Sequence, residues 1–230
     1  MLRTPRLSFI LIMVTAALPV LCVLLNHWLS IRGGYIPDCI PYFEGCTSIS
    51  STGRHGVSYW LFKAMMLPQA LLLFVFWRAL EARFRESGSH GVWMLRAGAA
   101  GALFLVLYTV FLGSSGDVYR LMRRYGVFVF FLGSLVAQVI ATLRLAQLND
   151  ATARWPKVVQ QSLLVLMILL ALAEVPLGQF GLADDAAENV IEWNFSLLMQ
   201  LWFASWLLPV GRSPRWVTAG RLGKVHHPLR

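Results

Sequence analysis

Six long apolar stretches limit what this chain can fold into more than any other feature of its sequence. Each is close to the roughly 20 apolar residues that an α-helix needs to cross the hydrocarbon core of a bilayer. Charged residues make up only 13% of the 230 residues, about half the share found in soluble domains. We therefore expect an all-α integral membrane protein, with one six-helix transmembrane bundle over residues 1–211. The helices are predicted at about 7–29, 57–80, 92–113, 125–148, 158–180 and 190–210.

The first apolar stretch follows a short basic segment, Met1-Leu-Arg-Thr-Pro-Arg6, which a secretory signal peptide would also have. Its apolar run from Leu7 to Leu25 is longer than the roughly 7–15 residues usual in a signal peptide. No pair of small residues typical of a cleavage site follows it. We interpret this stretch as a retained transmembrane helix.

Lysine and arginine residues are distributed unequally between the two sides of the predicted bundle. Fourteen fall on the side of the chain ends and six on the other side, which predicts cytoplasmic N and C termini. Residues 212–230 then form a basic cytoplasmic tail. The net charge of +9 is interpreted as this orientation signal plus attraction to anionic lipids, so no nucleic-acid partner is expected. The outer basic run Arg120-Leu-Met-Arg-Arg124 is interpreted as a solvated loop in preference to a lipid-phosphate site.

The stretch from Cys39 to His55 is the one long polar connection on the outer side. In an oxidising periplasm or lumen, Cys39 and Cys46 would be free to form a disulfide. Free thiols and a metal site are the alternatives, but zinc usually takes four ligands, and two thiols with a nearby histidine supply fewer. We favour the disulfide and expect neither a metal nor another cofactor.

No motif of a soluble enzyme family is present, and no histidine lies deep in a predicted helix where it could bind haem. His55 lies near Ser48, Ser50 and Ser51, a combination that could support nucleophilic catalysis. Serines in a turn-rich loop more often cap backbone groups, and we interpret these serines in that way.

Charged residues of three predicted helices fall at a similar depth. With a rise of 1.5 Å per residue, Lys63 lies about 10 Å below the outer start of its helix and Glu174 about as far below the outer end of its own. Glu192 and Asn194 fall near the outer start of the last helix. Ionisable residues in lipid are costly and often mark functional sites. The charged residues at this depth predict either a cluster of ion pairs with a structural role or a polar cavity open to the outer leaflet.

Small residues are concentrated in the third predicted helix, in the run Ala97-Gly-Ala-Ala-Gly-Ala102. Small residues at four-residue spacing allow helices to approach closely. We expect this run to pack inside the bundle. Pro68 is expected to kink the second helix, because it removes a backbone donor.

Four short motifs carry a family resemblance that spans nearly all of the chain. They are Ser48-Ile-Ser-Ser51, Trp60-Leu-Phe-Lys-Ala-Met-Met-Leu-Pro68, Leu112-Gly-Ser-Ser-Gly-Asp117 followed by Val127-Phe-Val-Phe-Phe131, and Ile191-Glu-Trp193 after Asp184-Asp185. With these motifs the chain resembles the six-helix membrane family that contains the fibroblast-growth-factor-receptor-activating protein, the DRAM autophagy modulators and the yeast Sfk proteins. The post-GPI-attachment factors and the amino-terminal part of the yeast Cwh proteins also belong there.

The resemblance implies a multi-pass protein that acts in lipid remodelling or lipid distribution at the lumenal or periplasmic leaflet. The Cys39/Cys46 pair and the Glu44-Gly45 turn depart from the family pattern and look like a bacterial-type variant. A bacterium has no GPI anchors, so the substrate does not carry over. We expect the inner membrane if the protein is bacterial, and an endomembrane or the plasma membrane if it is eukaryotic.

The leading hypothesis is a protein that binds or remodels a membrane lipid at the outer leaflet. The residues expected to hold the lipid head group are Arg54, Lys63, Arg120 and Asn194. Those expected as acid, base or positioning groups are Glu44, His55, Glu174 and Glu192. This hypothesis predicts that Lys63, Glu174 and Glu192 converge in one outward-facing cavity. The alternatives are a non-enzymatic scaffold or regulator of lipid distribution or partner proteins, and a small-solute transporter.

Overall fold

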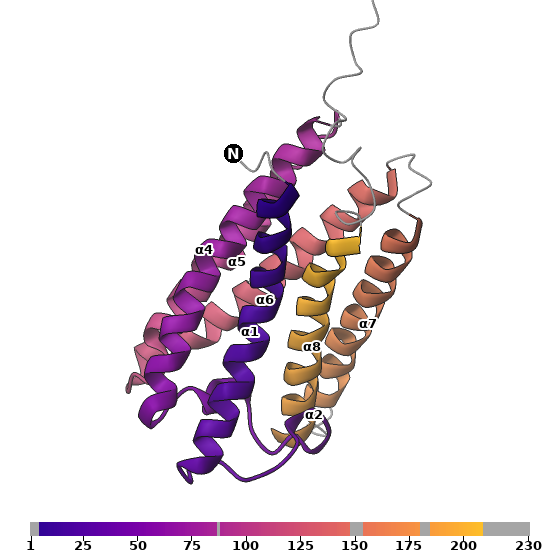
Figure 1. Ribbon diagram of the computed structural model, residues 1–230. Helices are drawn as coiled ribbons and strands as arrows, with labels where there is room; N and C mark the ends of the chain where they lie inside the picture. Colours follow the sequence, from indigo (N-terminus) through magenta and orange to yellow (C-terminus); the bar gives the residue numbers. More distant parts are fainter. Residues whose placement is uncertain (1–4, 87, 148–153, 180–184, 209–230) are drawn as a thin grey trace, which may run out of the picture.

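The computed structural model describes residues 5–86, 88–147, 154–179 and 185–208 (Figure 1). These parts of the chain fold into α-helices and contain no β-strand, which confirms the predicted all-α class. The helices are α1 (Pro5–Arg32), α2 (Pro41–Glu44), α3 (Ile49–Thr52), α4 (Gly56–Glu86), α5 (Val92–Phe111), α6 (Asp117–Gln147), α7 (Arg154–Gln179) and α8 (Asp185–Ser205). The predicted tail, 212–230, lies outside the described residues.

Five of the six long helices have the length and the apolar composition needed to cross a membrane. They are α1, α4, α5, α6 and α7, and they support the predicted integral membrane protein. Helix α8 has 21 residues but is not in this set. Its first half is polar, since it carries Glu188, Asn189, Glu192 and Asn194.

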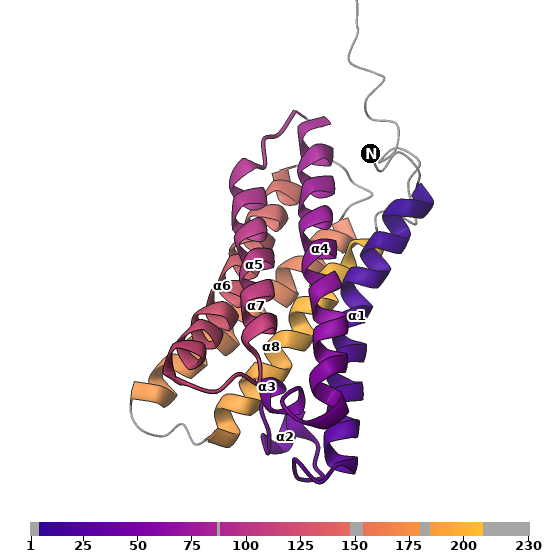
Figure 2. The ribbon, with the colours of Figure 1, turned by 90° about the vertical axis from the view of Figure 1, so that its left-hand side faces the viewer.

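The six long helices run between the same two ends of the bundle, as the two perpendicular views show (Figures 1 and 2). Each contacts its neighbours in the ring order α1, α4, α5, α6, α7, α8, and α8 also contacts α1. Helix α1 begins, and α8 ends, at one end of the ring. The short helices α2 and α3 lie at the opposite end, where both contact α8.

Helices α5 and α6 pack most closely, and small residues explain why. A Cβ atom on Gly133 would lie 2.8 Å from the carbonyl oxygen of Ala97, and one on Gly101 would lie 3.1 Å from the Ser134 hydroxyl. Side chains at these glycines would push the two backbones apart. The prediction that the small residues of α5 pack inside the bundle is therefore confirmed.

Aromatic side chains hold the second half of α8 in the centre of the bundle. Trp202 and Phe203 are fully buried. The ring of Phe203 packs edge-on against Phe76 of α4 at a centroid distance of 5.0 Å. The indole N–H of Trp202 donates to the Thr142 hydroxyl of α6 at 3.0 Å. Protein contacts, more than lipid contacts, therefore position this helix.

The start of α6 corrects one prediction. The run Arg120 to Arg124, expected as a solvated loop, forms the first turns of α6, which begins at Asp117. An acidic residue in the first turn stabilises the positive end of the helix dipole. Asp117 also forms an ion pair with Arg120 at 3.3 Å, with both side chains largely exposed.

Helix α4 contains Pro68, and it continues as one helix past this residue to Glu86.

Candidate functional site

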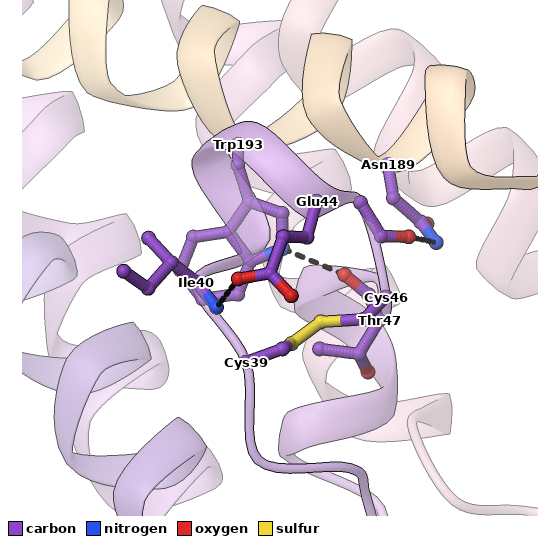
Figure 3. Close-up of a disulfide and its surroundings, with 8 residues drawn as sticks. Cys39, Ile40, Glu44, Cys46, Thr47, Asn189 and Trp193 are labelled. Atoms are coloured by element: carbon purple, nitrogen blue, oxygen red, sulfur yellow. Dashed lines mark hydrogen bonds between the residues drawn. A yellow bond between two sulfur atoms is a disulfide. The ribbon is translucent and has the colours of Figure 1, made fainter.

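The connection from residue 33 to residue 55, named the outer connection after its predicted side of the membrane, is folded against α8. Its disulfide joins Cys39 and Cys46 across α2 (Figure 3), which confirms the favoured cysteine prediction. Gly45 caps the C-terminus of helix α2, and its φ of +61° is in the left-handed region. A Cβ atom at Gly45 would overlap the backbone of Ala186. Only glycine therefore allows this turn to touch the first turn of α8.

Three side chains of α8 donate hydrogen bonds to carbonyl groups of the outer connection. Asn189 donates to Gly45 at 2.7 Å and the Trp193 indole donates to Thr47 at 2.8 Å (Figure 3). Asn194 donates to Tyr42 at 2.9 Å. The Asn194 amide, expected to bind a lipid head group, is thus engaged in holding the connection. These bonds fix the outer connection as a rigid wall beside α8.

Glu44 and Tyr42 have local roles in the same connection. The Glu44 carboxylate accepts a hydrogen bond from the backbone N–H of Ile40 at 2.9 Å and is exposed (Figure 3). The ring of Tyr42 packs edge-on against Trp193 at 5.2 Å. Burial raises the pKa of Tyr42 above its usual value.

A polar cavity of about 810 Å³ lies between the outer connection and the start of α8. Arg54 and His55 line it from the outer connection, and Asp185 and Glu188 line it from α8. Arg54 donates to the Ser50 hydroxyl at 2.6 Å. The His55 ring stacks on Tyr35 at 5.1 Å. The structure therefore brings two predicted site residues, Arg54 and His55, into one cavity.

A second, largely apolar groove of about 410 Å³ runs between α6, α7 and α8. Its α6 wall follows one face of the helix, because residues four apart in sequence lie one above the other. The residues of this wall are Val127, Phe128, Phe131, Leu132 and Leu135. Ala171 of α7 and Phe195 of α8 also line the groove.

The polar cavity and the apolar groove adjoin. Ser48, Glu188 and Asn189 line both. The Ser48 side chain caps α3 by accepting from the backbone N–H of Ser51 at 3.2 Å, as expected for a serine in this loop. The two spaces together form one amphiphilic site, polar at the end of the bundle and apolar along the helices.

Glu192 lies where the groove meets the interior of the bundle. It lines the groove and also an interior cavity of about 40 Å³, which has room for a water molecule. Its carboxylate accepts a hydrogen bond from the backbone N–H of Ile49 at 3.2 Å. Gln69 and Gln200 line the same interior cavity, and each has a buried side-chain oxygen with no hydrogen-bond partner in the described residues.

Lys63 lies apart from this site. Its ammonium group donates to the Tyr59 hydroxyl at 2.6 Å and to the Val110 carbonyl, near the end of α5, at 3.0 Å. It is absent from the linings of the three cavities described above. The structure thus does not bring Lys63 together with Glu192, and the Glu174 side chain lies outside the described residues.

Arg120 also lies apart from the site, on the first turn of α6 with Asp117. No group of three or more His, Cys, Asp or Glu side chains in the described residues could hold a metal ion.

Sequence reasoning missed Asp185, Glu188 and Asn189 as site residues. The signal for them in the sequence is their spacing from Glu192. Residues three, four and seven positions apart lie on the same face of a helix, so Asn189, Glu188 and Asp185 share a face with Glu192. It also treated Val127 to Phe131 only as a family motif, although this run supplies much of the groove wall. Comparison of the chain with protein-family models, with curated proteins and with solved structures finds no match.

Proposed function

We propose that this protein binds a membrane lipid at the outer leaflet, in the joined polar cavity and apolar groove. The observation that carries the proposal is the shared rim of Ser48, Glu188 and Asn189. A lipid has the same two-part chemistry, a polar head group and apolar chains. Burial of apolar chain in the groove would contribute about 25 cal/mol per Å², and the polar cavity would receive the head group.

The proposed membrane arrangement is six crossings with cytoplasmic N and C termini. Helix α8 completes the ring beside α1 and α7, and α1 begins at the end of the bundle where α8 ends. The excess of basic residues on that side favours the cytoplasm. A reporter fused after residue 208 is expected to be active only in its cytoplasmic form. Activity of a periplasmic reporter at that position would rule out the arrangement.

The resemblance to the family of the fibroblast-growth-factor-receptor-activating protein, DRAM and Sfk proteins agrees with a lipid-linked role. The motif run Val127 to Phe131 lines the groove, and Glu192 of the last motif lies at its junction with the bundle interior. We therefore propose membership of that family, as a bacterial-type member at the inner membrane. The interior cavity of about 40 Å³ is too small for a sugar or an amino acid, which weighs against the transporter alternative.

The binding test is to fill the groove. Ala171→Trp places a large ring in the groove wall, whereas Leu172→Trp changes a neighbouring side chain that is 60% exposed. Native mass spectrometry of protein extracted from vesicles of equimolar phosphatidylethanolamine and phosphatidylglycerol would measure retained lipid. We expect Ala171→Trp to lose most of it and Leu172→Trp to retain it. Equal retention by wild type and both variants would overturn the proposed binding site, and absence of retained lipid would favour a scaffold.

Lipid hydrolysis is a second candidate function, favoured by the position of Glu192 between the groove and a water-sized cavity. A carboxylate in contact with both water and substrate can act as a general base. It would take a proton from water while the water oxygen bonds to the ester carbonyl carbon. The ester C–O bond would then break, and the leaving oxygen would take that proton back from Glu192, which gives a carboxylic acid and an alcohol. Lipid profiles of a deletion strain complemented with wild type or Glu192→Gln would test this. We expect only the wild type to restore the profile, and an unchanged profile in the deletion strain would exclude remodelling.

A further inference from the structure

We propose that the polar cavity selects a head group that carries both a phosphate and a primary ammonium, as in an ethanolamine phospholipid. This inference rests on the proposed lipid binding and names the class of lipid bound. Its basis is the distribution of charge on the two walls of the cavity. The wall from the outer connection carries Arg54 and His55, and the wall from α8 carries Asp185 and Glu188.

The Arg54 guanidinium and the carboxylates of Asp185 and Glu188 face a shared space instead of neutralising one another. The salt bridges found in the described residues join Arg85 to Glu81 and Arg120 to Asp117, so none joins Arg54 to Asp185 or Glu188. The cavity between the walls has a volume of about 810 Å³. Opposite charges held on opposite walls complement a ligand that carries both signs of charge.

A chain of hydrogen bonds places the positive group close to the groove. The Ser48 hydroxyl, on the shared rim, lies 3.1 Å from the Ser50 hydroxyl, which accepts from Arg54 at 2.6 Å. A phosphate at the head of a lipid in the groove would therefore meet Ser48 and Arg54 first. Guanidinium groups bind phosphate oxygens through paired N–H donors.

The negative groups are placed to receive the ammonium. Glu188 lies on the shared rim together with Ser48, and Asp185 lies three residues earlier on the same face of α8. A primary ammonium donates three hydrogen bonds, which these carboxylates can accept. A head group with phosphate and no ammonium would leave the carboxylates facing an anion. A quaternary ammonium would satisfy the charge but donate no hydrogen bond.

The experiment is a competition for the intact protein in detergent, followed by native mass spectrometry. The competing lipids are phosphatidylethanolamine, phosphatidylcholine and phosphatidylglycerol with identical acyl chains. We expect wild type to prefer the ethanolamine lipid to the glycerol lipid by roughly five- to twentyfold, because each exposed ion pair adds about a two- to fivefold factor. Glu188→Gln and Asp185→Asn should each reduce this preference, and Arg54→Gln should weaken all three lipids alike.

Asp117→Asn is the matched control, because it removes an exposed carboxylate at the same end of the bundle and outside the cavities. It should leave the preference unchanged. Equal binding of the three lipids to wild type, or a preference that survives Glu188→Gln with Asp185→Asn, would overturn this inference and leave lipid binding intact. Absence of any bound lipid would instead overturn the proposed function itself.

Discussion

Helix α6 has two faces that are packed in opposite ways. Toward α5, Gly133 and Gly126 lie so close to the neighbouring backbone that a Cβ atom on either would be within 3.0 Å of it. Toward α7, the side chains of Phe128, Phe131 and Leu135 line a groove of about 410 Å³. Small residues let two helices close on each other, whereas large residues on the opposite face hold the next helix at a distance. One helix thus packs tightly against α5 on one face and leaves a groove beside α7 on the other.

The largest expected effect tests the sealed face. Gly133→Leu forces a side chain against the Ala97 carbonyl, and we expect a loss of about 3 kcal/mol or more, at the upper end of overpacking effects. Leu132→Ala, at the half-exposed neighbouring position on the groove side, should cost much less. Thermal unfolding in detergent, followed by tryptophan fluorescence, measures both. Similar midpoints for the two variants would show that the faces do not differ in packing.

The second-largest effect tests the outer connection, which lies at the polar end of the groove between α6, α7 and α8. Replacing Cys39 and Cys46 with serine removes the cross-link, and we expect a loss of about 2–3 kcal/mol for so short a closed loop. Reductant should lower the unfolding midpoint of wild type and leave that of the double variant unchanged. If reductant lowered the unfolding midpoint equally in wild type and in the double variant, the disulfide would not be the source of the stabilisation.

The third effect tests the boundary between the groove and the sealed interior. Glu192→Leu removes the acceptor of the Ile49 backbone N–H, and an unpaired buried donor costs about 1–2 kcal/mol. Glu192→Gln keeps an acceptor oxygen and should stay close to wild type. The measurement is the difference between the unfolding midpoints of Glu192→Leu and Glu192→Gln. A more stable Leu variant would show that burial of the carboxylate outweighs its hydrogen bond.

The smallest effect concerns the exposed start of α6, outside both faces. Arg120→Gln breaks the ion pair with Asp117, but both side chains are largely exposed, so we expect a change of no more than about 0.5 kcal/mol. Unfolding midpoints at low and high salt measure it. A clearly larger loss at low salt would mean that this ion pair stabilises the protein more than exposed pairs usually do.

The sequence predicted the helices well because apolar stretch length is a strong physical signal. The packing of Ala97 and Gly101 was also predictable, since small residues at that spacing allow close approach. The start of α6 was placed too late, because the prediction followed the apolar stretch and treated Arg120 to Arg124 as a solvated loop outside it. In the structure, these residues extend the helix beyond the apolar stretch, with Arg120 exposed beside Asp117.

The candidate site was only partly predictable for a geometric reason. Depth along a helix follows from residue number, so Lys63 and Glu192 could be assigned to similar levels. Direction around the bundle does not follow from residue number, and Lys63 in fact contacts Tyr59 and Val110. Arg54 and His55 could be proposed from the loop sequence, but their neighbours Asp185 and Glu188 come from the last helix. Such a pairing depends on which helices are adjacent.

The two walls of the polar cavity are made at very different times during synthesis. About 130 residues separate His55 from Asp185, which a ribosome adds in roughly 7–26 s. Until α8 emerges, the carbonyls of Tyr42, Gly45 and Thr47 lack the donors that later hold them. A chain that has not yet made α8 therefore lacks the three hydrogen bonds that hold residues 42–47 in place, so the polar cavity forms only after the last helix is complete.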